Sequence, residues 1–147
     1  MRLENIIQPT GVITEGMTIR DGFIECVKNN VPGIPCVDAG GKVTACFSIR
    51  KTIMSACIPA VLVKYADLLG DIPDCTSIPE EHARQVLSLP ADTFINHDVI
   101  AISSASTIAK SVALMEKHKV SYLFVIDDDK YHGVVTIENI ARRMLEF

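Results

Sequence analysis

The stretch Ile19-Arg-Asp-Gly-Phe-Ile-Glu-Cys-Val-Lys-Asn-Asn-Val31 leads into Gly33-Ile-Pro-Cys-Val-Asp38. The same pattern returns later, where Ile108-Ala-Lys-Ser-Val-Ala-Leu-Met-Glu-Lys-His-Lys-Val120 leads into Tyr122-Leu-Phe-Val-Ile-Asp127. Ile108 follows Ile19, and Asp127 follows Asp38, by the same 89 residues. A repeat of this length predicts two similar units packed together. The seam between such units is a natural place for a ligand.

The first copy predicts a helix whose N-terminus is supported by Thr18 or Asp21 and which ends at Pro32-Gly33. A buried strand at 34–37, a tight turn and a returning strand at 43–47 follow. Ser48 then begins a helix that runs to about residue 54. The expected apolar stripe of the first helix comprises Phe23, Cys26, Val27 and Val31.

The second copy predicts the same order of elements. Ser106 or Thr107 caps its first helix, and a continuous apolar strand at 123–126 indicates burial on both faces. An acidic turn and a returning strand at 131–135 follow, and Thr136 opens the last helix. The expected apolar face of the first helix comprises Ile108, Val112 and Met115.

The repeat predicts a first unit at 1–58, a helical connection at 59–90 and a second unit at 91–147, together one domain. Within the connection, 60–69 is expected to be helical, 71–77 an irregular link, and Pro79 the start of a helix that ends before Pro90. Two similar short segments precede the units, Leu3-Glu-Asn-Ile-Ile and Ala91-Asp-Thr-Phe-Ile. The first connecting helix either packs into the core or covers a dimer interface; its apolar residues are Val61, Leu62, Tyr65, Leu68 and Leu69.

Composition narrows the class of protein. The 147 residues are 48% hydrophobic, which excludes a disordered chain, and the net charge of −4 argues against nucleic acid or an anionic membrane surface as a partner. The sequence has neither a secretory signal nor an apolar run long enough to insert in a membrane, so a cytoplasmic location is expected. The cysteine count is odd and lacks a Cys-x-x-Cys pair, so Cys26, Cys36 and Cys46 are expected to be reduced core thiols.

Each copy has the same order of elements: a helix, an apolar strand, an acidic turn, a strand that ends in a small hydroxyl residue, and a second helix. Two such copies in tandem resemble a cystathionine-β-synthase (CBS) domain pair. The resemblance rests on Val31-Pro-Gly-Ile-Pro-Cys-Val-Asp38 with Ala45-Cys-Phe-Ser-Ile-Arg-Lys51 in the first copy. In the second copy it rests on Val120-Ser-Tyr-Leu-Phe-Val-Ile-Asp127 with His132-Gly-Val-Val-Thr-Ile-Glu-Asn-Ile140. It covers nearly the whole chain apart from the connection.

This resemblance implies an α/β (α+β) fold in which two βαββα units form a pseudo-two-fold pair with two clefts. It implies that the clefts bind an adenosine compound, namely AMP, ADP, ATP or S-adenosylmethionine, with no cofactor required. It further implies a homodimer and a regulatory rather than enzymatic role. Most such pairs are attached to an enzyme or transporter, whereas this chain resembles the stand-alone type, which acts on a separate effector. The alternative is a ligand-free structural or interaction module.

The family's ligand motif places Ser/Thr-x-x-Asp at the start of each last helix, where the hydroxyl and helix N–H groups meet a phosphate and the carboxylate holds the ribose. Here the second copy supplies Thr136 and Asn139, and the first supplies Ser48 and Lys51. Asn139 keeps one acceptor oxygen, whereas Lys51 cannot accept from ribose. Lys51 either extends into water or, with Arg50, faces the phosphate of a nucleotide held mainly by the other unit.

Other residues are expected to line the two clefts. The adenine pocket of the second copy is expected around Ser103, Val120 and Tyr122. His132 either approaches this cleft or is an ordinary strand-surface histidine. The counterparts in the first copy are Thr14, Val31 and Gly33. Without the family, ordinary helix capping explains Thr136 and Ser48 better than ligand binding does. The motifs favour the second copy as the binding site, so Thr136→Ala is expected to weaken binding more than Ser48→Ala.

Catalytic and metal-binding patterns are not recognisable in the sequence. Asp127, Asp128 and Asp129 are adjacent on a turn, so their carboxylates do not converge on one ion. The histidines form no His-x-x-x-His pair, and a Ser/His/Asp or Cys/His arrangement is missing. The sequence therefore predicts neither an enzyme nor a metal site.

Overall fold

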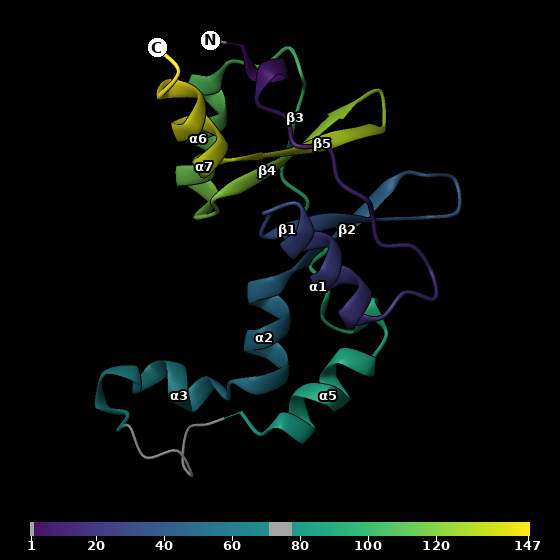
Figure 1. Cartoon of the computed structure of the whole chain (residues 1–147), viewed down its shortest axis with the longest axis vertical. Helices are drawn as coiled ribbons and strands as arrows, with labels where there is room; N and C mark the ends of the chain where they lie inside the picture. The colour runs from purple at the N-terminus through teal and green to yellow at the C-terminus, as the bar shows by residue number, and fades with distance from the viewer. Residues whose placement is uncertain (1, 71–77) are drawn as a thin grey trace.

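The computed structural model describes residues 2–70 and 78–147. In the first unit, β1 (Gly33–Val37) pairs antiparallel with β2 (Val43–Ser48). In the second, β3 (Ala101–Ile102) lies parallel to β4 (Tyr122–Asp127), which pairs antiparallel with β5 (Lys130–Thr136). The two sheets lie next to each other, with helices on their outer sides (Figure 1). This mixed α/β arrangement confirms the predicted fold class.

Helix caps determine where the main helices begin. In α1 (Ile19–Lys28) the alternatives Thr18 and Asp21 act together, because each side chain accepts a hydrogen bond from the other residue's backbone N–H. Ser48 caps α2 (Ile49–Cys57). Of the two candidates for α6 (Ile108–His118), Thr107 is the cap, and Thr136 caps α7 (Ile137–Met144) as predicted.

The apolar stripe predicted for α1 is partly wrong. Val27 is 68% exposed, whereas Ile19 and Cys26 are fully buried. The helix turns Gly22 onto the ring of Phe47, where an added Cβ would lie 2.5 Å from Cζ. The Phe47 ring can lie this close to α1 only where the helix has a glycine. The contact with Gly22 therefore sets the rotation of α1 about its axis and leaves Val27 in solvent.

The segment that precedes each unit packs on the other unit. Gln8 exchanges two backbone hydrogen bonds with Val134 of β5, at 2.8 and 2.9 Å, and Asn96 exchanges two with Cys46 of β2, at 2.7 and 2.9 Å. Leu3, in the short 3-10 helix η1 (Leu3–Asn5), belongs to the hydrophobic core of the second unit. Ala91 belongs to the core of the first. The two predicted units therefore exchange their first segments.

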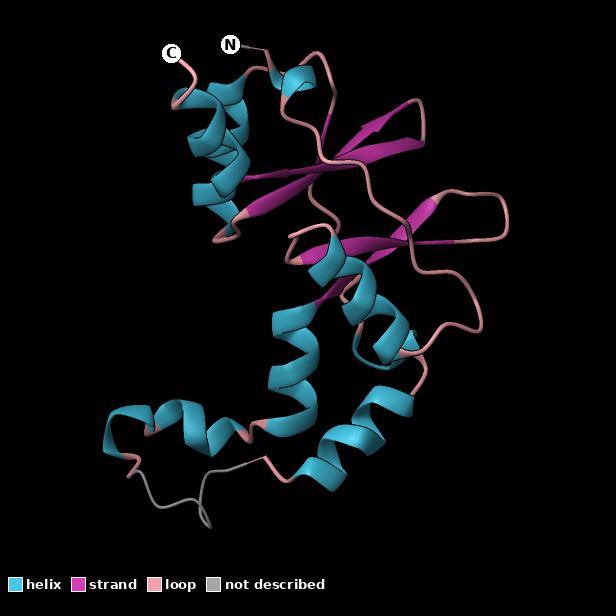
Figure 2. Ribbon diagram, in the orientation of Figure 1, coloured by secondary structure: helices cyan, strands magenta, loops and turns pink. Residues whose placement is uncertain are grey.

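The connection departs from the body of the molecule. The helix predicted at 60–69 is a shorter α3 (Ala60–Lys64) followed by the 3-10 helix η2 (Ala66–Leu68), and both extend away from the two sheets (Figures 1 and 2). Helix α5 (Glu80–Ser88) returns to the first unit and leads into the 3-10 helix η3 (Ala91–Phe94). The irregular link predicted at 71–77, with Cys75, lies outside the described residues.

The predicted core thiols are confirmed. Cys26, Cys36 and Cys46 are free and buried. Burial raises the pKa of the Cys26 and Cys36 thiols to about 12, so both are protonated and unreactive at neutral pH. Among the described residues, no helix is both long and apolar enough to cross a membrane.

Candidate functional site

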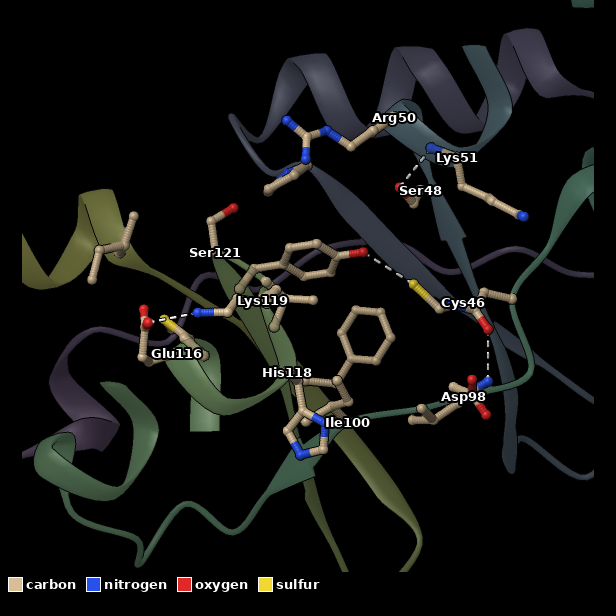
Figure 3. Close-up of a pocket in the computed structure, with 18 of the residues that line it drawn as sticks. Cys46, Ser48, Arg50, Lys51, Asp98, Ile100, Glu116, His118, Lys119 and Ser121 are labelled. Carbon is tan, nitrogen blue, oxygen red and sulfur yellow. Dashed lines mark hydrogen bonds and ion pairs between the residues drawn. The ribbon is translucent and has the colours of Figure 1, made fainter. Parts of the chain in front are cut away.

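A cleft of about 1280 Å³ opens between the two units (Figure 3). Its walls are the start of α2, residues 96–100, the end of α6 and residues 120–122. The apolar part of the lining consists of Val99, Ile100, Val112, Met115, Val120, Tyr122, Phe124 and Ile137. The charged or titratable part consists of Arg50, Lys51, His97, Asp98, Glu116, His118, Lys119 and Glu138. The cleft therefore offers an apolar surface with charged groups around it.

The start of α2 is the most cationic wall. The Ser48 hydroxyl accepts a hydrogen bond from the backbone N–H of Lys51 at 3.2 Å, and Arg50 and Lys51 occupy the first turn, which has no acidic residue. Neither cation forms an ion pair within residues 2–70 and 78–147. Because a helix N-terminus carries partial positive charge, the two side chains add to a field that already favours anions.

The carboxylates of the cleft come from three other parts of the chain: residues 96–100, α6 and α7. Glu116 is neutralised by Lys119, whose Nζ lies 2.7 Å from its carboxylate oxygen. Asp98 and Glu138 make no ion pair in the described part of the chain. Two carboxylates therefore remain available in the cleft to accept hydrogen bonds from hydroxyl groups of a ligand.

Tyr122 connects the units at the base of the cleft. Its hydroxyl lies 3.1 Å from Sγ of Cys46, and the ring reaches across to Gly33, where an added Cβ would lie 2.6 Å from the hydroxyl oxygen. Burial raises the pKa of both Tyr122 and Cys46. Both groups are therefore neutral at physiological pH, so this part of the cleft is uncharged and has no thiolate nucleophile.

Four of the predicted site residues lie together in this cleft: Ser48, Lys51, Val120 and Tyr122. They come from both units, since Ser48 and Lys51 belong to the first copy and Val120 and Tyr122 to the second. The sequence motifs instead grouped each last helix with strands of its own copy. Lys51 lines the cleft and is also exposed, which fits both interpretations of its side chain, in water or facing a phosphate.

The predicted residues of the second copy's motif lie elsewhere. Thr136 is only 1% exposed, and its hydroxyl accepts from the N–H of Asn139 at 3.0 Å. Asn139 lines a separate hollow of about 160 Å³. Ser103 is exposed and accepts from Ala105 N. The open cleft is therefore the one beside Ser48, not the one that the motifs favoured.

The remaining predicted residues also lie outside the cleft. His132 lies 3.2 Å from the Asp127 carboxylate, whose pKa is lowered by hydrogen bonds from Ser104 and, to a smaller extent, by His132 itself. Val31 is buried in the first unit's core, and Thr14 is exposed. Gly33 is buried and contributes by leaving space for Tyr122.

The two clefts differ because their edge segments are held differently. On the N-terminal side, Thr10 is hydrogen-bonded to Tyr131, and Gly11 N donates to Glu25 of α1 at 2.6 Å. These contacts tie the segment to β5 and to α1. Residues 97–99 correspond to it, and within the described residues their only hydrogen bond is local, from Asp98 N to the Asn96 side chain. The cleft beside 97–99 therefore stays open.

Sequence reasoning missed several lining residues, above all 96–100 and the end of α6. A signal for the first group was present. Gln8 and Asn96 are both amides, and each follows one of the two similar segments that precede the units. Extending the repeat back to these positions would have predicted an equivalent role for both, although not that only one borders an open cleft.

Residues 84–146 match the family model described as CBS domain. This part of the chain is a CBS domain, and the chain as a whole has the fold of a CBS domain pair.

Solved structures of similar fold support the assignment of the whole chain to the fold of a CBS domain pair. One is a putative acetoin utilization protein from Vibrio cholerae, with 19% identity and a TM-score of 0.67 over 99% of this chain and 93% of that one. Another is the CBS domain pair of protein MJ0100, solved with 5′-methylthioadenosine and S-adenosyl-L-methionine, with 18% identity and a TM-score of 0.66 over 99% and 97%. A third is the CBS domain of a membrane protein from Sphaerobacter thermophilus, with 15% identity and a TM-score of 0.67 over 97% and 86%. At these identities the likeness concerns the fold alone.

Proposed function

We propose that this chain is a regulatory module whose open cleft binds an adenosine-containing ligand such as AMP, ADP, ATP or S-adenosylmethionine. One observation carries the proposal: the cleft joins a cationic helix N-terminus of the first unit to an apolar surface supplied largely by the second. A nucleotide is complementary to both parts of this cleft, since it links an anionic phosphate to a flat, largely apolar base. The MJ0100 pair, solved with two adenosine compounds, supports this class of ligand.

The phosphate is placed at the start of α2. Backbone N–H groups of the first turn lack partners inside a helix and attract anions. The Arg50 guanidinium can bind phosphate through two parallel hydrogen bonds, and Lys51 adds a second positive charge. Lysine at position 51 thus suits a phosphate better than it suits a ribose.

The nucleoside is placed against the apolar wall. Val120, Tyr122 and Ile100 line the cleft and offer the apolar surface that an adenine ring needs. Because Lys51 cannot accept a hydrogen bond, the ribose hydroxyls need another partner. Asp98 and Glu138, the two carboxylates without an ion pair among the described residues, are the available acceptors.

The regulatory part of the proposal rests on the cleft having walls from both units. Residues 96–100 border it and also connect the units, because Asn96 is hydrogen-bonded to β2 and Ile100 O accepts from Phe124 N in β4. A ligand that touches both units stabilises one relative placement of them. A separate effector, an enzyme or a transporter, could then respond to that placement.

Ligand-induced stabilisation tests the proposal. Protein stripped of ligand is expected to gain about 2.7 kcal/mol of unfolding free energy at a ligand concentration 100 times the dissociation constant. Thermal unfolding with AMP, ADP, ATP and S-adenosylmethionine measures it, with ribose 5-phosphate and inorganic phosphate as probes of the phosphate subsite. If none of the four adenosine compounds shifts the transition at millimolar concentration, the chain is a ligand-free interaction module instead.

A matched pair of variants tests which cleft is used. Ser48→Ala and Thr136→Ala each remove a helix cap, at a similar cost of about 1 kcal/mol. Only Ser48 lines the open cleft. We therefore expect Ser48→Ala to weaken nucleotide binding by about tenfold, and Thr136→Ala to leave it within about twofold, as measured by calorimetry. The opposite order would place the ligand at the α7 motif, as the sequence alone suggested.

A further inference from the structure

Residues 59–69, which we call the arm, form an exposed apolar surface. The arm consists of Pro59, α3, Tyr65, η2 and Leu69, and it extends from the end of α2 away from both sheets (Figure 1). Its large apolar side chains are solvent-exposed: Leu68 is 80% exposed, Val61 57% and Val63 52%. None of its residues belongs to either hydrophobic core of the described chain. Contiguous exposed apolar surface of this kind marks an interaction site in a soluble protein.

The charge of the arm favours a second copy of the chain as its partner. The chain as a whole carries a net charge of −4, so two copies repel each other over most of their surfaces. The arm carries one positive and one negative side chain, Lys64 and Asp67, so its net charge is zero. Around a two-fold axis, Lys64 of each copy can face Asp67 of the other, because such an interface places residue i against j and j against i.

The chain exposes more area than a compact monomer of its mass. The chain exposes 9304 Å². A compact monomer of 16.1 kDa exposes about 7,400 Å², so this chain leaves about 1,900 Å² more in solvent than its size requires. Each partner in a standard interface buries only about 800 Å². The arm and the adjoining face of α2, where Ile53 is 37% and Met54 36% exposed, are where such an interface would form.

We infer that the arm is a self-association element that packs against the arm of a second copy of this chain. Its apolar side chains form the centre of the interface, and Lys64 and Asp67 lie at its rim. The ligand cleft is lined by different residues, since no residue of the arm belongs to it. Self-association and ligand binding can therefore be tested separately.

Light scattering after size exclusion tests this inference with the full chain at about 100 µM. The wild type is expected to be dimeric. Val61→Glu and Leu68→Glu are each expected to raise the dimer dissociation constant by at least about 30-fold, because they place charge in the apolar centre. Both residues are exposed in the single chain, so the monomer should stay folded by circular dichroism. Val27→Glu is the matched control, since Val27 is 68% exposed on α1, away from the arm.

Three outcomes would overturn the inference: a monomeric wild type, arm variants that dimerise as the wild type does, or dissociation by Val27→Glu alone. Thermal shifts with the adenosine compounds, measured on the same variants, separate this inference from the ligand proposal. Arm variants that become monomeric yet keep the ligand shift support both. A dimer without any ligand shift supports the arm and removes the proposed ligand.

Discussion

Lys51→Glu is expected to weaken nucleotide binding by about 100-fold while making the free protein slightly more stable. Binding falls because a positive charge beside the phosphate is replaced by a negative one. Stability rises by about 0.3–1 kcal/mol because a carboxylate in the first turn suits the helix dipole. It would also complete a capping box with Ser48, like the one that Thr18 and Asp21 form in α1. Calorimetric titration and urea unfolding measure the two effects.

Lys110→Glu is the control for this substitution. Lys110 stands at the same place in α6, where its N–H donates to the hydroxyl of the cap Thr107 at 3.1 Å, but it does not line the cleft. It should gain similar stability and leave binding unchanged. Equal losses of affinity in the two variants would mean that overall charge matters rather than a phosphate subsite at α2.

Gly133→Ala is expected to destabilise the protein by about 2–4 kcal/mol. Gly133 has φ of +153°, and a Cβ there would lie 2.5 Å from the carbonyl oxygen of Gln8 and 2.7 Å from Ile7. The Gln8 oxygen belongs to backbone that is hydrogen-bonded to Val134, so it cannot move aside without breaking the exchanged edge pairing. Urea unfolding followed by circular dichroism gives the change in free energy.

Gly41→Ala is the control that separates the cost of backbone strain from the cost of a steric clash with the added Cβ. Gly41 also has a positive φ, of +82°, but an added Cβ would meet no atom within 4 Å. Its cost should be the backbone cost alone, about 1 kcal/mol. If Gly133→Ala costs no more than Gly41→Ala, the segment at Gln8 does not lie on β5, and the exchange of edge segments is wrong.

Much of the local structure could be predicted because it depends on residues close together in the chain. The caps at Ser48, Thr107 and Thr136 use a hydroxyl three residues before the N–H that it accepts from. The turn between β4 and β5 is formed by Asp128 and Asp129, both with positive φ, as a tight hairpin requires. Spacing of apolar residues was less reliable, as Val27 shows, because the rotation of α1 depends on Gly22 meeting Phe47 from another element.

The candidate site could be predicted only in part, because only some of its residues belong to local sequence motifs. The motif positions Ser48 and Lys51 could be read from the sequence, but their grouping with Val120 and Tyr122 depends on how the two sheets meet. Two amides at equivalent positions, Gln8 and Asn96, are indistinguishable by pattern. The hydrogen bonds of the neighbouring Thr10 and Gly11, which residues 97–99 lack within the described chain, distinguish the two edges.

By itself, the sequence determined that this protein is a duplicated helix–strand–strand–helix unit, because that pattern is written in side-chain periodicity and in local caps. The tertiary structure decided three further matters: which segment completes which unit, which cleft is open, and that the arm lies in solvent rather than in the core. Each of these depends on contacts between residues far apart in the chain, such as Gln8 with Val134 and Gly33 with Tyr122. Local spacing carries no information about such contacts, whereas shape and hydrogen bonding between the folded units do.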